Sequence, residues 1–112
     1  MKKLEIIIPD RRLDDVNDIL KDANTGGMSY SKIEGRGKIK AEPVAIGRGI
    51  MHYKPEFIPR IKVEVVIKDE QVKEIVTNLT EKLGDKIGGK IFILDVPVAV
   101  DLTTRNTGES AI

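Results

Sequence analysis

Hydrophobic and polar positions divide the chain into short segments with two different spacings. Residues 3–8, KLEIII, form a β-branched run typical of a strand, and Pro9 ends it, followed by Asp10, which is expected to cap a helix. Apolar residues then recur about every 3.6 positions, which predicts a helix that ends at the glycine pair 26–27. Residues 28–34 are predicted as a second strand, with imperfect alternation. The apolar positions of this first helix are Leu13, Val16, Leu20 and Ala23.

A second strand–helix–strand series follows later in the chain. Residues 58–66 alternate between apolar and polar side chains, which predicts a strand. Asp69 is expected to cap the next helix and Gly84 to end it. The run at 90–96, KIFILDV, is nearly all apolar and predicts a buried strand, whereas the polar residues after Val100 are expected to be irregular. The apolar stripe of the second helix comprises Val72, Ile75, Val76, Leu79 and Leu83.

A long segment without a sustained period, residues 35–57, separates the two series. It holds glycines at 35, 37, 47 and 49 and prolines at 43 and 55, which oppose regular structure. A loop of this length is uncommon in a compact domain and usually has a function. We therefore expect a functional loop here.

The order strand–helix–strand, long loop, strand–helix–strand predicts an α+β fold. Two right-handed units of this kind form the ferredoxin-like βαββαβ sandwich, in which both helices cover one face of a four-stranded antiparallel sheet. The 112 residues suit one domain, 1–112. The other face would carry alternate strand residues, many of them apolar, and a monomer exposing them would tend to associate. We therefore expect an oligomer that buries this face.

Composition narrows the possible functions. The chain contains no Cys and one His, His52, which excludes disulfides, thiolate chemistry and a multi-histidine metal site within one chain. A formal net charge of +1 does not indicate a nucleic-acid-binding surface. No apolar run reaches the roughly 18–20 residues of a membrane span, and charged residues return too soon after Met1 for a signal peptide. We expect a cytoplasmic protein without a metal site or membrane insertion.

Two glycine–lysine clusters are candidates for an anion site. One is 35–38, GRGK, at the end of the second strand, and the other is 88–90, GGK, before the last strand. Glycine lets backbone N–H groups converge on phosphate oxygens, and lysine adds a point charge. Each cluster alone is explained as well by a plain turn with solvated lysines. Together, at strand ends expected to be neighbours in one sheet, they favour an anion site.

Several motifs follow one another in a specific order over nearly the whole chain. The chain opens with 1–9, MKKLEIIIP, followed by LDDV. The later motifs are 27–29 leading into 33–37, Arg48-Gly49, 57–66, the shortened signature 86–92, and the ending 107–109 with 111–112. In this order they resemble one family, the PII nitrogen-status signal proteins.

The resemblance implies a homotrimer that senses adenine nucleotides. PII proteins have a ferredoxin-like core, bind ATP or ADP in clefts between subunits, and many also bind 2-oxoglutarate with MgATP. Their long T-loop, about 38–56 here, docks onto ammonium transporters or nitrogen-assimilation enzymes. Nucleotide binding would act as a switch by ordering this loop. A polar carboxy-terminal tail would span about 101–112.

The resemblance also implies a nucleotide site, residue by residue. Glu64 matches a buried carboxylate in the adenine region, and Lys90 would be the principal cation for phosphate. Residues around the base and ribose would be Ile7, Gly27, Met28 and Ser29. Residues near the phosphates would be Gly35, Arg36, Gly37 and Lys38, together with Gly88 and Gly89.

The chain departs from the family pattern around the phosphates and the effector. Ile39 stands where a glutamine helps to hold Mg and 2-oxoglutarate, and it has no oxygen to offer a cation. Arg60 replaces a lysine that contacts 2-oxoglutarate, which keeps the charge but changes the shape. The late pair of phosphate-binding arginines falls on 101–103, DLT, although Arg105 is near enough to substitute after a register shift. These changes argue against 2-oxoglutarate sensing and for weaker ATP binding, with Mg held through phosphates at most.

Two further functions compete with a nucleotide-sensing regulator. The first is a divergent PII-like protein whose pocket takes another small metabolite anion, with weak or lost nucleotide binding. The second is a ferredoxin-like nucleic-acid module, which needs paired aromatics on the sheet, and Phe92 alone is not enough. An enzyme is not expected, because no nucleophile–base pair can be assembled from this composition. Tyr53 occupies the place of a tyrosine modified in some PII proteins, but an ordinary loop aromatic is the simpler interpretation, as an exposed loop histidine is for His52.

Overall fold

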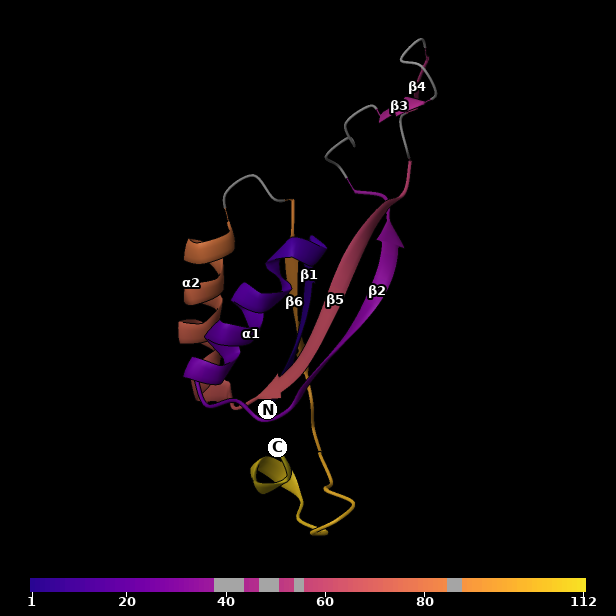
Figure 1. Cartoon of the computed structure of the whole chain (residues 1–112). Helices are drawn as coiled ribbons and strands as arrows, with labels where there is room; N and C mark the ends of the chain where they lie inside the picture. The colour runs from indigo at the N-terminus through magenta and orange to yellow at the C-terminus, as the bar shows by residue number, and fades with distance from the viewer. Residues whose placement is uncertain (38–43, 47–50, 54–55, 85–87) are drawn as a thin grey trace.

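The computed structural model describes residues 1–37, 44–46, 51–53, 56–84 and 88–112. Two α-helices and four longer strands make up its body (Figure 1). None of the helices within these ranges is long and apolar enough to cross a lipid bilayer. The longer elements are β1 (Lys2–Ile8), α1 (Leu13–Asp22), β2 (Met28–Gly35), β5 (Ile58–Ile67), α2 (Val72–Leu83) and β6 (Lys90–Asp95).

The four longer strands form one antiparallel sheet in the order β2-β5-β1-β6. Both helices lie on the same face of this sheet, as Figure 1 shows. Strands β1 and β5 form the centre of the sheet, and β2 and β6 form its edges. This arrangement confirms the expected ferredoxin-like βαββαβ fold.

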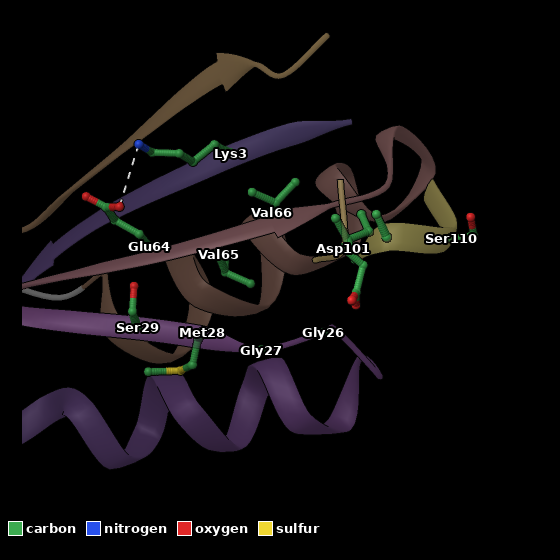
Figure 2. A pocket seen from close by; sticks show the side chains of 12 residues that line it. Lys3, Gly26, Gly27, Met28, Ser29, Glu64, Val65, Val66, Asp101 and Ser110 are labelled. Carbon is green, nitrogen blue, oxygen red and sulfur yellow. Dashed lines mark ion pairs between the residues drawn. The ribbon is translucent and has the colours of Figure 1, made fainter. Parts of the chain in front are cut away.

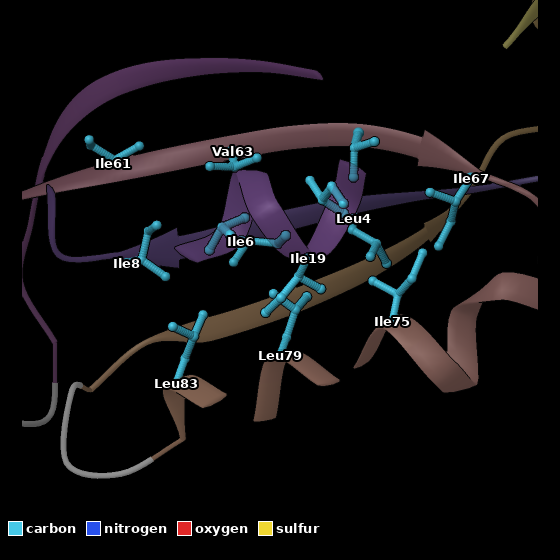
Figure 3. Close-up of a cluster of buried hydrophobic side chains, with 13 residues drawn as sticks. Leu4, Ile6, Ile8, Ile19, Ile61, Val63, Ile67, Ile75, Leu79 and Leu83 are labelled. Carbon is cyan, nitrogen blue, oxygen red and sulfur yellow. The ribbon is translucent and has the colours of Figure 1, made fainter. Parts of the chain in front are cut away.

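The hydrophobic core lies between the sheet and the two helices (Figure 3). The central pair β1 and β5 is in register from Lys2↔Ile67 to Ile8↔Ile61, so alternate residues of both strands face the helices. Because the side chains are almost entirely Ile, Val and Leu, packing requires few hydrogen-bond partners inside. The buried residues are Leu4, Ile6, Ile8, Val16, Ile19, Leu20, Ile61, Val63, Val65, Ile67, Ile75, Leu79 and Leu83.

The expected aspartate caps are wrong at both helices. Each helix is preceded by a 3₁₀ turn, Asp10–Arg12 or Asp69–Gln71, so the aspartate lies inside the first turn rather than before it. At the second helix the Gln71 side chain accepts the backbone N–H of Lys68 at 3.1 Å. Asp69 instead pairs with the amino group of Met1 at 2.9 Å. A carboxylate in the first turn still interacts favourably with the helix dipole.

The last strand, β6, is not buried in the single chain. It lies at a sheet edge, and the side chains of Phe92, Ile93 and Leu94 are between 42% and 49% exposed. The open face of the sheet also differs from the prediction, because its centre carries the charged residues Lys3 and Glu64 and not mainly apolar ones. An apolar run therefore identified the strand but not its place in the sheet.

Two segments expected to be irregular contain short regular elements. The long loop includes a pair of three-residue strands, β3 (Val44–Ile46) and β4 (Met51–Tyr53). The tail contains a bridge between Val100 and Thr107 and a 3₁₀ turn at Gly108–Ala111. The remaining T-loop residues expected at 38–43, 47–50 and 54–55 lie outside the described residues.

We predict that Ile75→Ala lowers the free energy of unfolding by about 2–5 kcal/mol, because Ile75 is fully buried and alanine leaves a cavity. Thr77→Ala, at an exposed position of the same helix, is the matched control and should change stability little. Chemical denaturation at one fixed protein concentration measures both. Equal effects for the two substitutions would contradict the position of the core.

Candidate functional site: two half-sites at opposite edges of one sheet

A pocket of about 590 Å³ lies where β2 begins and β5 ends. Glu64 of β5, Lys3 of β1 and Asp101 of the tail contribute its charged groups (Figure 2). We call it the first pocket. It brings together four of the predicted residues: Gly27, Met28, Ser29 and Glu64.

The carboxy-terminal tail forms one wall of the first pocket. Asp101 and residues 110–112 line it together with Gly26 and Gly27, which lead into β2 (Figure 2). The tail reaches Gly26 closely, because a Cβ added there would lie 2.9 Å from the backbone carbonyl carbon of Ile112. Gly26 therefore permits a backbone-to-backbone approach that a side chain would block.

Asp101 is held in one orientation by a local turn. Its Oδ1 accepts the backbone N–H groups of Thr103 at 2.8 Å and Thr104 at 3.0 Å. The N–H of Thr104, followed by that of Thr103, holds the pKa of the Asp101 carboxyl below its usual value. The resulting stabilisation is therefore present at neutral pH and is lost as the pH falls through the pKa of the folded state.

An ion network crosses the open face of the sheet and reaches the first pocket. Lys3 Nζ lies 3.2 Å from Glu5 Oε1 and 3.6 Å from Glu64 Oε2, and Lys62 Nζ lies 3.4 Å from Glu64 Oε1. The hydrogen bond to Glu5 and the charge of Glu64 raise the pKa of Lys3. Two lysines therefore orient the Glu64 carboxylate.

A second group of predicted residues lies at the other edge of the sheet, where β6 begins. The register pairs Ile7 with Lys90, and both residues line a pocket of about 520 Å³ with Gly88 and Gly89. We call it the second pocket. Gly88 has φ +70°, a backbone conformation that favours glycine and suits a turn whose N–H groups converge on an anion. Lys90 is exposed at this end.

Within one chain these two groups lie apart. Met28 belongs to the edge strand β2 and Lys90 to the opposite edge strand β6. The register also offsets them along the strands by three positions, about 10 Å, because Met28 is level with Leu4 and Lys90 with Ile7. The expectation that the two glycine–lysine clusters lie at neighbouring strand ends is also wrong. They share one end of the sheet, but β2 and β6 are its opposite edges, roughly 14 Å apart across three strand spacings.

Similarity to known proteins identifies the family of this chain. A family profile described as "Nitrogen regulatory protein P-II" matches residues 1–106. The chain belongs to the P-II family. Proteins of that name from Pasteurella multocida and Cereibacter sphaeroides are each 38% identical to it over their whole length and over all of this chain. "Nitrogen regulatory protein P-II 1" of Escherichia coli K12 is 33% identical with the same coverage.

The remaining residues predicted from the P-II resemblance lie in or beside the long loop and in the tail. Arg36 Nη1 pairs with Glu56 Oε1 at 2.9 Å, which joins the two sides of the long loop at its base. Arg60 donates to the backbone oxygen of Pro59 at 3.1 Å. Arg105 has φ +64° in the tail turn and is not among the residues that line the first pocket. Gly37 follows β2, the backbone of Tyr53 belongs to β4, and Lys38 and Ile39 lie outside the described residues.

Sequence reasoning missed Lys3 and the end of the tail, Ser110–Ile112, as parts of the first pocket. Lys3 was detectable, because pairing the two central strands places it on the same face as Glu64. The tail was not, because its approach depends on a turn at Asp101 and on the small size of Gly26, neither of which shows a periodic pattern.

We predict that Gly26→Ala displaces the tail from the first pocket, because the new Cβ would overlap the backbone of Ile112. Gly27→Ala is the matched control, since a Cβ there would meet nothing within 4 Å. Amide hydrogen exchange of residues 108–112 should rise in the first variant and stay unchanged in the second. Unchanged exchange in both would show that the tail does not depend on this approach.

Proposed function

We propose that this P-II family member is a signal transduction protein that binds ATP or ADP between copies of its chain and regulates a partner in nitrogen assimilation. The observation that carries the proposal is the division of the predicted nucleotide residues between the two opposite edges of one sheet. Three strand spacings separate these edges within one chain, whereas a neighbouring copy can place its second pocket beside the first. The site is therefore completed by assembly.

The exposed apolar surface supports assembly. Six of the eight large apolar side chains exposed in the described residues fall between positions 92 and 102, on β6 and the segment that follows. Leu102 is 93% exposed. Such a concentration is typical of an interaction surface. We propose that a homotrimer covers it, as the resemblance to PII proteins implies.

The first pocket suits the base and ribose of a nucleotide. It lies against β2, an edge strand whose outer backbone groups are not used by the sheet and can pair with the edge of a base. The Ser29 hydroxyl and the Glu64 carboxylate add a donor and an acceptor for hydroxyl or amino groups.

The second pocket suits phosphates. Lys90 supplies a cation beside Gly88 and Gly89, which allow backbone N–H groups to approach oxygen atoms. Arg36 lies at the same end of the sheet, but it is already paired with Glu56 at the base of the loop. A phosphate that attracts Arg36 would compete with this pair, which links nucleotide binding to the loop that would dock an ammonium transporter or a metabolic enzyme.

A second candidate function follows from the charge of the first pocket. Asp101 places a fixed negative charge in its wall, and Ile39 offers no oxygen for Mg. A divergent member of the family that senses another small metabolite anion at the second pocket, with weak nucleotide and no 2-oxoglutarate binding, is therefore the alternative. We do not propose catalysis in either case.

Calorimetric titration with ATP, ADP and 2-oxoglutarate, with and without Mg, tests the proposal. We predict binding of ATP or ADP to a trimer and no heat with 2-oxoglutarate. Lys90→Ala should weaken ATP binding at least about tenfold through loss of a charge-assisted contact. Lys73→Ala, which removes the same charge from the exposed side of α2, is the control and should have no effect. A trimer that binds neither nucleotide would leave the metabolite alternative.

A further inference from the structure

The wall of the first pocket carries more negative than positive charge. Glu64 and Asp101 contribute two carboxylates, and Lys3 contributes one ammonium group. That ammonium is shared between Glu5 and Glu64, at 3.2 Å and 3.6 Å. Among the residues that the structure describes, no cation lies within ion-pair distance of Asp101.

Asp101 cannot easily turn away from the pocket. Its Oδ1 is engaged by the N–H groups of Thr103 and Thr104, and the same turn is closed by hydrogen bonds from the Asp101 N–H to Asn106 O at 2.9 Å and from the Arg105 N–H to Asp101 O at 2.8 Å. A rotation of the carboxylate would leave two backbone donors without their acceptor. A ligand in the first pocket therefore meets a carboxylate that is fixed in place and remains charged at neutral pH.

We propose that Asp101 is a specificity residue that makes this site prefer adenine nucleotides with few phosphates over ATP. The inference rests on the proposed function and adds to it the ligand class. The uncharged nucleoside suits a pocket with carboxylate acceptors, because its hydroxyl and amino groups can donate hydrogen bonds to them. Each added phosphate brings negative charge within a Debye length of Asp101, where repulsion is incompletely screened.

The charge of Asp101 sets an order of affinity among the adenine nucleotides. In the absence of Mg, AMP and ADP bind more tightly than ATP, so the protein reports a low phosphorylation state of the adenylate pool. The preference comes from charge and not from shape, because the side chain lines the wall without closing the pocket. Raising the salt concentration from about 0.05 M to 0.5 M should therefore narrow the difference in binding affinity between ADP and ATP.

The experiment is a Mg-free titration of adenosine, AMP, ADP and ATP into the full chain and into Asp101→Asn. Asparagine keeps an oxygen for the N–H groups of Thr103 and Thr104, so the turn is retained while the charge is lost. ATP affinity should rise about three- to tenfold in the variant, the effect expected of one partly screened charge near a polyanion, and adenosine affinity should not change. Asp18→Asn, at an exposed position of α1 that is not among the residues lining the pocket, removes the same charge and is the control.

The outcomes separate this inference from the proposed function. If ATP and ADP bind but Asp101→Asn leaves their affinities unchanged, or changes adenosine and ATP equally, the specificity role is wrong and the nucleotide site remains. If no adenine compound binds to the wild-type chain or the variant, the proposed function is wrong and this inference fails with it. Amide NMR signals of Thr103 and Thr104 at folded positions in Asp101→Asn confirm that the turn, and so the comparison, is intact.

Discussion

The antiparallel register of β1 and β5 is the constraint on which the rest of the structure depends. Because Lys2 is opposite Ile67 and Ile8 is opposite Ile61, one set of alternate residues faces the helices and the other set faces outward. The inner set forms the aliphatic core. The outer set includes Lys3 and Glu64, so the same register that builds the core also aligns the charged groups of the first pocket. A shift by one residue would exchange the two faces.

This register also determines why the candidate site is divided. The first pocket lies where β2 begins and the second where β6 begins, and these two strands are the opposite edges of the sheet. Assembly is therefore a requirement of the proposed nucleotide site and not an addition to it. The apolar residues exposed on β6 and the following segment provide a reason for copies to associate, and the edge of β2 remains available for a ligand.

Much of the fold could be predicted from periodicity. The alternation at 58–66 and the helical stripe from Val72 to Leu83 identified β5 and α2, and Gly84 ended the helix as expected. The exposure of β6 could not be predicted, because an apolar run does not distinguish a central strand from an edge strand that another copy covers. The site residues came from resemblance, which assigns roles but not distances. It therefore gave no sign that Gly27 and Lys90 lie at opposite edges of the sheet, or that the tail beyond Asp101 lines the first pocket.

The most direct test of the account is complementation between two variants that each damage one half-site. Ser29→Trp obstructs the first pocket and Lys90→Ala removes the cation of the second, so each variant alone should bind ATP and ADP poorly. Mixed oligomers, purified through two different tags after co-expression, should regain binding at interfaces that combine the intact half of each chain. Mixed oligomers that form but bind no better than either parent would contradict a site shared between copies.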